Sequence, residues 1–419
     1  MKLIKINNEM NLMHIKTDKF NTLTVSLVLR TKLSRETATK NALIPLILGR
    51  GTAKYKDIQS IQAKQEQLYG AIFDTNVIKK GEEQLVQIFT ECLKTPDCVV
   101  ETLSFLREAA VNVLTKGDGF LPKYFNSEKE NLKNQILSRQ NDRMEYSKLR
   151  CIEEMCREES FGIYGDGYSE DISSIENTEL LTHYKRLLRE NPIEFVVVGN
   201  IETEKIAEEI NRLFSGVERE NAKSFEKPRL ETIRRDAPQN VTEEADVLQG
   251  KLCVGIRSSA ERTGDEFYNF LLANEIFGGI PESLLFSNIR EKESLCYHIR
   301  SFAYRFKSII LVQAGINAAD RDRTAEMIVN QLEVVKNGEF SESVFENSKI
   351  GLIKRFESVS DYQSHLMDFC LTQHMLEDSD SIAEIVNRIS KATKDGVVNA
   401  VKDACIDTYY SLLPRSEVI

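Results

Sequence analysis

The order of predicted elements repeats about halfway along the 419-residue chain, and this repeat constrains the fold more than any other feature. The first run is a strand, two helices and two strands, at 23–29, 34–50, 58–69, 71–79 and 83–89. The second run has the same order, at 252–256, 266–277, 282–292, 297–306 and 308–314. An offset of 227 residues places Glu66 on Glu293 and Leu68 on Leu295. The repeat predicts two copies of one α+β domain, each an antiparallel β-sheet with helices packed against it.

A stretch between the two runs has the composition of a linker. It carries many charges, two prolines and few apolar residues. A chain of 419 residues also exceeds one ordinary core, because domains hold roughly 100 to 200 residues each. We therefore predict an N-terminal domain at 1–215, a linker at 216–240 and a C-terminal domain at 241–419. Further helices near 325–336, 341–359, 363–377 and 382–402 and a strand near 408–413 complete the second copy.

Composition excludes several classes of protein. With 41% hydrophobic and 29% charged residues, the chain has the make-up of a soluble globular protein. Its net charge of −10 argues against a nucleic-acid partner, which requires a basic face. The N-terminus turns polar at once, and no run is apolar for the roughly 20 residues that span a bilayer. We therefore expect a cytoplasmic protein with no membrane partner.

The cysteines and histidines do not form a metal-binding pattern. Eight cysteines are scattered without zinc-finger or redox spacing, which indicates reduced thiols. Cys151 and Cys156 lie about 140° apart if they share a helix, so a shared metal is not expected. His365 and His374 fall on roughly opposite faces of a helix. We expect structural or surface roles for these residues and no cofactor in this chain.

Several local patterns fix the expected elements more closely. Leucine and valine at odd positions of 23–29 alternate with Thr24 and Ser26, which predicts a strand with one apolar face. Ser34 is the expected N-cap of the next helix. A capping box of Ser127 with Glu130 predicts one long helix that runs to about 159. The glycine-rich loop 162–167 lacks the Gly-Lys-Ser/Thr ending of a phosphate loop, so we expect a plain turn.

The predicted helix 34–50 ends in Gly51-Thr52, and its interest lies in what it lacks. With its flanking strand and Gly-Thr pair, the segment resembles the helix of the insulinase/pitrilysin metallopeptidases, or inverzincins, that carries the zinc motif His-x-x-Glu-His. The processing-peptidase branch is the most similar. Alignment on Gly51-Thr52 places the three motif positions on Ala42, Pro45 and Leu46. These side chains offer neither a metal ligand nor a general base. Pro45 also removes a helical hydrogen bond and is expected to kink the turn.

The resemblance covers essentially the whole chain and implies a mitochondrial processing peptidase-like fold. In catalytic relatives a glutamate on the helix that matches 127–159 is the third zinc ligand. The nearest match is Gln135, and a neutral amide is a poor zinc ligand. The resemblance thus implies a degenerate member of the family that does not assemble the zinc site alone.

The stretch from Phe277 to Tyr297 carries the positive signal. It reads Phe-Gly-Gly-Ile-Pro-Glu-Ser-Leu-Leu-Phe-Ser-Asn-Ile-Arg-Glu-Lys-Glu-Ser-Leu-Cys-Tyr and resembles the C-terminal-domain signature of the processing-peptidase branch. In relatives the arginine and tyrosine, here Arg290 and Tyr297, hold substrate and stabilise the tetrahedral intermediate. A guanidinium offers fixed donors to peptide carbonyls, and a phenol can donate to an oxyanion. The alternative is an exposed arginine paired with Glu293 beside a half-buried tyrosine. Gly278-Gly279 fits a helix stop better than a loop that admits a peptide.

This combination implies a non-catalytic pseudopeptidase subunit. In the family, subunits that lose the zinc ligands pair with a homologue that carries His-x-x-Glu-His, and the two enclose a peptide or small protein. We expect zinc in that partner and none here. The alternative is a non-enzymatic binding or structural protein on the same fold, like core subunits of respiratory complexes. A self-sufficient hydrolase has little support, because no Ser/His/Asp or Cys/His set is apparent.

Overall fold

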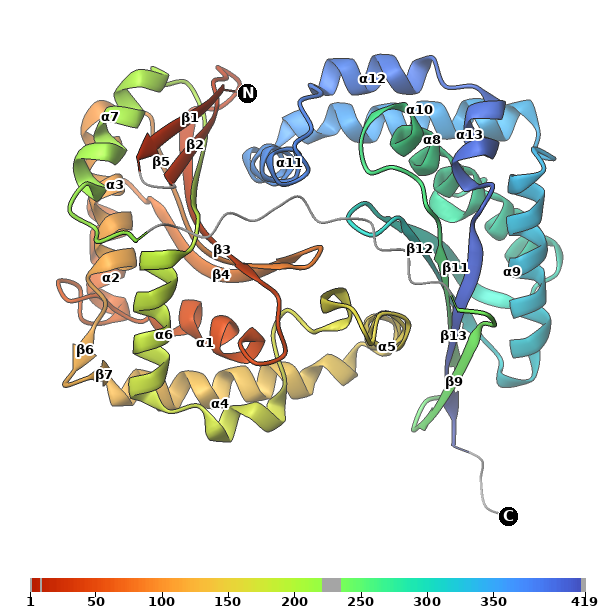
Figure 1. Ribbon diagram of the computed structural model, residues 1–419, viewed down its shortest axis with the longest axis horizontal. Coiled ribbons are helices and arrows are strands. Elements are labelled where there is room, and N and C mark those ends of the chain that lie inside the picture. The colour runs from red at the N-terminus through yellow and green to blue at the C-terminus, as the bar shows by residue number, and fades with distance from the viewer. Residues whose placement is uncertain (1, 8–9, 221–234, 416–419) are drawn as a thin grey trace. The chain divides into compact units, whose positions relative to one another are not determined.

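The computed structural model describes residues 2–7, 10–220 and 235–415. The chain divides into two compact units (Figure 1). Unit 1 contains Met1–Ser138, Ile163–Glu226 and Ser360–Met375, and unit 2 contains Arg139–Gly162, Lys227–Val359 and Leu376–Ile419. Much of the predicted linker 216–240 lies outside the described residues, so its extent stays a prediction.

Unit 1 is built on a six-stranded sheet with the order β1-β2-β8-β3-β5-β4. The strands in that order are Lys2–Asn7, Met10–Ile15, Ile193–Val198, Thr22–Lys32, Glu83–Leu93 and Ile72–Lys80. Neighbouring strands are antiparallel except β2 and β8, which are parallel. The expected antiparallel sheet is therefore a mainly antiparallel mixed sheet.

One face of this sheet carries the main core of unit 1. Its helices are α1 Ala38–Leu48, α2 Ile58–Gln67, α3 Pro96–Val111, α4 Pro122–Ser138, α6 Asn177–Glu190 and α7 Thr203–Phe214. A small hairpin, β6 Thr115–Lys116 with β7 Gly119–Phe120, and the short helix η3 Ser169–Ser174 lie between them in sequence. Leu23, Val25, Leu27 and Leu29 of β3 are all buried in this core, as their alternation predicts.

The start of α1 differs from the prediction. The helix begins at Ala38 with Thr37 as its N-cap, not with Ser34. Ser34 instead forms the turn before the helix, because its carbonyl accepts from the backbone N–H of Ala38 at 2.9 Å. The hydroxyl of Ser34 forms a hydrogen bond with the hydroxyl of Thr37 at 2.8 Å. A serine with a local hydrogen-bond partner therefore marks a turn here rather than a cap.

Unit 2 is built on a five-stranded sheet with the order β11-β12-β10-β13-β9. The strands in that order are Cys296–Tyr304, Ile309–Ile316, Gly250–Arg257, Cys405–Pro414 and Gln239–Ala245. Only β13 and β9 are a parallel pair within this sheet. The helices are α5 Arg143–Met155, α8 Gly264–Asn274, α9 Arg321–Lys336, α10 Glu342–Ser358, α12 Ile382–Ser390 and α13 Lys394–Val401. Two π-helices, η4 Glu275–Gly279 and η5 Leu285–Lys292, follow α8.

The predicted duplication is confirmed by the strand orders. Read from β4, the first sheet runs β4-β5-β3-β8-β2, and read from β11 the second runs β11-β12-β10-β13-β9. Each run closes with one parallel pair. The offset of 227 residues relates β3 to β10, α1 to α8 and α2 to η5. The two units are therefore copies of one fold, and in the described residues β1 has no counterpart.

Each half of the chain contributes one helix to the other unit. Helix α11, Gln363–Met375, belongs to unit 1 although it follows α10 of unit 2. It covers the sheet face opposite the main core, and its first residue, Gln363, donates to the carbonyls of Thr22 and Val198 at 3.1 Å each. In Figure 1 this blue helix lies with the red and orange strands. Helix α11 packs mainly on β8 and β2, and on the neighbouring strand β3 the residues Thr24, Ser26 and Val28 are buried as well.

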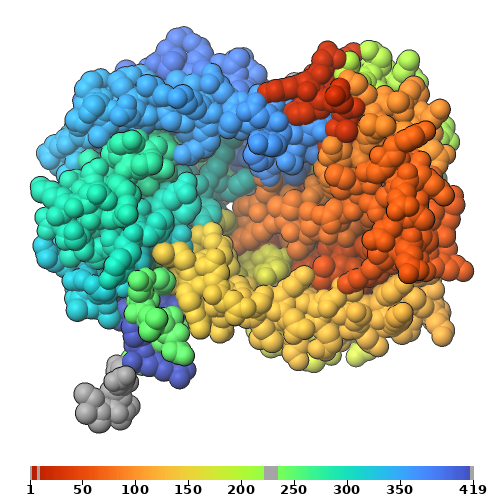
Figure 2. Space-filling model, turned by 180° about the vertical axis from the view of Figure 1, so that it is seen from behind, coloured from red at the N-terminus to blue at the C-terminus, as the bar shows by residue number. Residues whose placement is uncertain are grey.

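Helix α5 is the reciprocal contribution. The predicted long helix 127–159 breaks after Ser138, and the chain enters unit 2 through η1 Arg139–Asn141 and α5, which Asp142 caps. Figure 2 shows its yellow surface against the green surface of that unit. Helix α5 packs closely on β10 at Gly255. A Cβ at this position would lie 2.6 Å from the sulfur of Met155, so a larger residue would clash with α5. The prediction of Ser127 as a cap is wrong, because Ser127 lies inside α4.

In unit 1 an arginine and a carboxylate fasten the C-terminal end of α11. Arg30 donates to both carboxylate oxygens of Glu83 at 2.8 Å and to Glu194 at 3.4 Å. His374, next to last in α11, lies 3.3 Å from the same Glu194 oxygen. Burial alone would raise the pKa of Glu194, but the hydrogen bond and charge of His374 and the charge of Arg30 lower it.

Unit 2 has the equivalent arrangement. Arg257, at the offset of 227 from Arg30, donates to Asp407 at 2.8 Å and to the carbonyl of Met155, the last residue of α5, at 2.9 Å. It also donates to Glu159 at 2.5 Å, and Lys307 pairs with the other oxygen of that carboxylate at 2.5 Å. An arginine at a helix C-terminus satisfies a carbonyl that the helix itself cannot. We call these two buried sets the Arg30 clasp and the Arg257 clasp.

Two further observations concern the whole described chain. All eight cysteines are free thiols, seven of them buried. Within residues 2–7, 10–220 and 235–415, no helix is both long enough and apolar enough to cross a membrane.

Candidate functional site

Helix α1 holds the three positions that match the zinc motif. Ala42 is 2% exposed and packs in the core of unit 1, Pro45 is buried, and Leu46 is half-buried. The helix remains α-helical past Pro45 to Leu48. The carbonyl of Pro45 accepts from the hydroxyl of Thr75 at 2.7 Å, a contact from the neighbouring strand β4. These positions have therefore become hydrophobic core, and none presents an atom that binds a metal.

Gln135 lies on the exposed side of α4. The carboxylate on the buried side is Glu128, which pairs with Arg50 at 2.5 Å and accepts from Asn131 at 2.9 Å. Sequence analysis missed this ion pair. Its signal is the spacing of Glu128, Leu132 and Ile136 by four residues, which puts a carboxylate on an apolar helix face.

A zinc ion does not fit these residues. In the part of the chain that the structure describes, no group of three or more His, Cys, Asp or Glu side chains is placed to hold a metal. The buried carboxylate of α4, Glu128, pairs with Arg50. No catalytic step is therefore derived through a metal held by this chain.

A buried polar network lies beside the motif positions instead. Arg186 can only donate, so Nδ1 of His183 accepts at 3.2 Å and the Nε2–H group donates to Asn41 at 2.7 Å. The Asn41 amide donates to Gln84 at 2.8 Å, and Gln84 donates to the carbonyls of Ala38 and Gly165. This chain of bonds requires a neutral imidazole. Burial, with the nearby charges of Arg186 and Lys40, lowers the pKa of His183 to about 4.

The glycine-rich stretch 162–167 forms a loop that joins this network through the carbonyl of Gly165. Gly167 has φ +77°, and a Cβ there would lie 2.4 Å from the hydroxyl of Thr39 on α1. The N–H of Gly167 closes a turn on the carbonyl of Tyr164 at 3.2 Å. The loop is therefore a turn that packs on α1, as expected, and it accepts a bond from Gln84 through Gly165.

Arg290 and Tyr297 are in direct contact in unit 2. Nε of Arg290 donates to the backbone carbonyl of Tyr297 at 3.1 Å. The guanidinium lies 4.5 Å from the ring of Phe286 and pairs with Glu291 at 3.3 Å. Glu293 pairs with Arg323 instead. Arg290 is thus held against the strand that carries Tyr297, and the pairing with Glu293 in the alternative interpretation is absent from the described residues.

Tyr297 stands out from the sheet. Its side chain is 57% exposed, which is more than the half-buried ring of the alternative interpretation. The register of β11 against β12 slips between Cys296 and His298, so Tyr297 sits at a β-bulge. Its hydroxyl donates to Asn317 at 3.2 Å. Bulges re-aim side chains next to functional sites, and here the bulge turns a phenol toward solvent.

The backbone that leads to Arg290 is irregular as well. Both η4 and η5 are π-helical, a rare geometry that is frequent at functional sites. Gly278 and Gly279 end η4, in agreement with the prediction of a helix stop. Gly278 is also required by packing, because a Cβ there would lie 2.7 Å from both Leu285 and the hydroxyl of Ser301.

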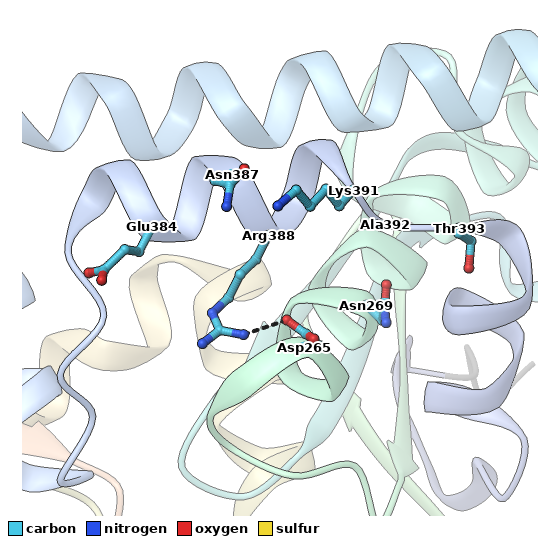
Figure 3. A pocket seen from close by; sticks show the side chains of 8 residues that line it. All are labelled: Asp265, Asn269, Glu384, Asn387, Arg388, Lys391, Ala392 and Thr393. Carbon is cyan, nitrogen blue, oxygen red and sulfur yellow. Dashed lines mark hydrogen bonds and ion pairs between the residues drawn. The ribbon is translucent and has the colours of Figure 1, made fainter.

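Unit 2 also contains a polar pocket of about 490 Å³ between α8 and α12 (Figure 3). Arg388 crosses it and donates to Asp265 at 2.6 Å, and it also pairs with Asp380 at 2.9 Å. The charges that line this pocket therefore largely neutralise each other. Neither Arg290 nor Tyr297 lines it.

Comparison with known proteins matches this architecture. A family model described as "Peptidase M16 inactive domain" matches residues 174–352. The chain is 29% identical over 409 residues to a Bacillus subtilis (strain 168) protein named "Probable inactive metalloprotease YmfF", covering 95% of this chain and 94% of that protein.

Two solved structures show the same fold. A conserved protein from Enterococcus faecalis V583 aligns with a TM-score of 0.92 at 23% identity, covering 100% of this chain and 99% of that one. A chain of Complex III2 from Candida albicans aligns with a TM-score of 0.74 at 13% identity, covering 100% and 97%. At these identities the likeness concerns the fold alone.

The structure thus has a duplicated α+β fold, with carbon side chains at the three positions that the sequence comparison assigned to the zinc motif. Over residues 174–352 the chain is similar to the inactive domain of the M16 peptidases, and over nearly its whole length it is similar to a protein named a probable inactive metalloprotease.

Proposed function

We propose that the chain is the pseudopeptidase subunit of a heterodimeric zinc metallopeptidase in the cytoplasm. It supplies substrate-positioning residues and half of a peptide-enclosing chamber to a homologous subunit that carries His-x-x-Glu-His. The observation that carries this proposal is a contrast within one chain. The motif positions on α1 have become core, whereas Arg290 and Tyr297 remain accessible on irregular backbone.

The geometry suits Arg290 for holding a peptide backbone. Nε is occupied by Tyr297 and Nη1 by Glu291, which fixes the plane of the guanidinium. Among the described residues Nη2 has no partner, so its donors are free for a peptide carbonyl. The contact with Phe286 holds the side chain without using a donor.

Tyr297 serves as a second donor. Its exposed phenol reaches Asn317 through a bond of 3.2 Å, which a substrate oxygen can replace at little cost. A phenol O–H directed at a developing oxyanion stabilises the transition state more than the ground state. The zinc ion and the general base come from the partner, because this chain has no group for either role at the motif positions.

Reconstitution with a zinc-bearing homologue tests the proposal. Arg290→Ala and Tyr297→Phe should each raise the barrier of the reconstituted pair by about 2 to 4 kcal/mol, measured as kcat/KM on a peptide substrate. Arg323→Ala is the matched control, because it removes an exposed arginine of unit 2 that pairs with Glu293. The control should leave turnover unchanged. Unchanged turnover in all three variants would contradict a role at the reacting centre.

A second candidate function is a non-enzymatic scaffold. The fold is shared with a chain of Complex III2 from Candida albicans, which supports a structural role on the same architecture. A scaffold predicts that the chain associates with its partner while Arg290→Ala and Tyr297→Phe change neither assembly nor turnover. The same reconstitution therefore separates the two functions.

A further inference from the structure

Three basic side chains share one face of the unit 2 sheet next to Tyr297. His298 of β11 lies opposite Gly315 of β12, and Gly315 lies opposite Lys251 of β10. Arg300 is two residues beyond His298 and therefore points to the same side of β11. His298 and Arg300 are exposed, and Lys251 is half-buried. We call Lys251, His298 and Arg300 the cationic row.

Gly315 leaves a notch in the middle of this row. A Cβ built on Gly315 would have only the ammonium of Lys251 and the methyl of Met144 near it, each at 3.8 Å. The floor between His298 and Lys251 is therefore backbone, with Met144 of α5 at one side. Adjacent strands lie about 4.8 Å apart, so the backbones that carry His298 and Lys251 are about two strand spacings apart, and the Lys251 ammonium reaches back over Gly315 between them.

The acidic groups nearby are already engaged. The charged groups nearest the row in sequence and register are Asp142, Glu145, Lys148, Arg290 and Glu291. Glu145 pairs with Lys148, Glu291 pairs with Arg290, and Asp142 accepts two backbone N–H groups of α5. In the described part of the chain, Arg300 and Lys251 have no ion-pair partner. After burial, the charges of Arg300, Arg290 and Lys251 lower the pKa of His298, so at neutral pH the positive charge of the row comes from Lys251 and Arg300 and His298 contributes a neutral N–H donor.

We propose that the cationic row binds an acidic, extended segment of a peptide. Side chains two residues apart in an extended peptide are separated by about 6.6 to 6.8 Å, which matches the spacing of His298 and Arg300 along β11. Strand β11 is the edge of its sheet and leads directly from Arg290 and Tyr297. The inference rests on the proposed function, because it assigns the substrate class of that site. The whole chain has a net charge of −10, which attracts basic peptides. The cationic row favours an acidic peptide only at short range, where its own positive field exceeds that of the rest of the chain.

Peptide binding by the full-length chain alone tests this inference. The probes are two fluorescein-labelled 12-residue peptides, one of alternating Ala and Glu and one of alternating Ala and Gln, followed by fluorescence anisotropy. The Glu peptide should bind about ten-fold more tightly at low salt, and the difference should shrink as salt rises. Arg300→Ala and Lys251→Ala should each weaken the Glu peptide about three-fold and leave the Gln peptide unchanged. Arg323→Ala changes the net charge equally and should have no effect.

The outcomes separate the inference from the proposed function. Equal binding of the two peptides, no measurable binding of either, or tighter binding of a single-stranded oligonucleotide of equal charge would overturn the cationic row as a peptide site. Because the assay contains no partner, a preference for the Glu peptide supports the row even when the reconstituted pair shows no turnover. Turnover of the reconstituted pair without that preference would support the proposed pseudopeptidase function and contradict peptide binding by the cationic row.

Discussion

Units 1 and 2 share strand order and a buried arginine clasp, yet they differ at the helix that follows the central strand. In unit 1 that helix, α1, is regular, and its side chains form core. In unit 2 the counterpart α8 passes into two π-helices and a bulge that present Arg290 and Tyr297. Regular helix with core side chains in one copy and irregular backbone with exposed polar side chains in the other make unit 2 the place to test for function.

The clasps show what the two copies keep in common. Arg30 and Arg257 are equivalent positions, and each meets a carboxylate on the neighbouring strand at the C-terminal end of an exchanged helix. The exchange ties each unit to residues from the other half of the chain. The fold therefore depends on two sets of contacts, one at each exchanged helix, between residues that lie on opposite sides of the predicted linker in the sequence.

The largest expected effect comes from breaking a clasp. Arg257→Met leaves the buried carboxylates of Asp407 and Glu159 short of a partner, and Arg30→Met does the same to Glu83. Each should lower the free energy of unfolding by about 3 to 5 kcal/mol in urea titrations. Arg212→Met, which removes an exposed pair with Glu209, should leave the free energy of unfolding unchanged within error.

Hydrogen exchange shows whether the two clasps act alike. Arg257→Lys keeps the charge and folds where the methionine variant fails, and it should speed amide exchange in α5 while α11 stays protected. Arg30→Lys should do the reverse. A loss below about 1 kcal/mol for either methionine variant, or uniform exchange in both lysine variants, would contradict the equivalence.

The next effect distinguishes the units by pH. The folded pKa of His183 is about 4, below its value of 6.5 when unfolded, so its contribution to stability is present above pH 6.5 and lost as pH falls toward 4. The expected loss between pH 7 and pH 5 is about 2 kcal/mol. His183→Gln should flatten this dependence.

The hydrogen-bond network behind this pH effect is specific to unit 1. At the offset of 227, Asn41 corresponds to Tyr268, whose hydroxyl donates to Asp380 at 3.4 Å instead. The lowered pKa of Glu194 gives a loss of stability only as pH falls below 4.5, outside this window. An unchanged slope in the His183→Gln variant would place the titration elsewhere, with His14 the next group to test because burial also lowers its pKa.

A smaller effect compares equivalent glycines. Gly51 follows α1 and Gly278 ends η4, at the same offset of 227. A Cβ on Gly51 would meet backbone atoms of Lys56 at 2.9 Å, whereas a Cβ on Gly278 would meet side chains of Leu285 and Ser301. Gly51→Ala should therefore cost about 2 kcal/mol and Gly278→Ala about 1 kcal/mol, by thermal or urea unfolding. The reverse order would show that the π-helical segment is the more rigid one.

Periodicity predicts the parts of the fold that depend on local sequence. The alternation in β3 fixes its core face, and the repeat at an offset of 227 fixes the topology. It cannot show that Thr24 and Ser26 are buried too, because their burial depends on tertiary packing and not on the pattern of β3 itself. Nor can it show that the predicted helix 127–159 crosses between units after Ser138.

The sequence predicts which residues form the candidate site, but it does not predict the backbone geometry that positions them. The signature from Phe277 to Tyr297 identifies the arginine and the tyrosine, but a period of 3.6 residues does not distinguish α- from π-helix. The bulge at Tyr297 depends on the register with β12, which a single strand does not encode. Helical spacing predicts that Glu128 lies on the apolar face of its helix. The two clasps could not be predicted in this way, because their members are far apart in the sequence and only the fold brings them together.

The most direct test of the central claim measures zinc and peptidase activity together in the purified chain, before and after addition of Zn²⁺. The side chains at Ala42, Pro45 and Leu46 predict no stoichiometric zinc and no cleavage by the chain alone, with cleavage appearing when a His-x-x-Glu-His homologue is added. One zinc per chain together with peptide cleavage in the absence of any partner would contradict the account.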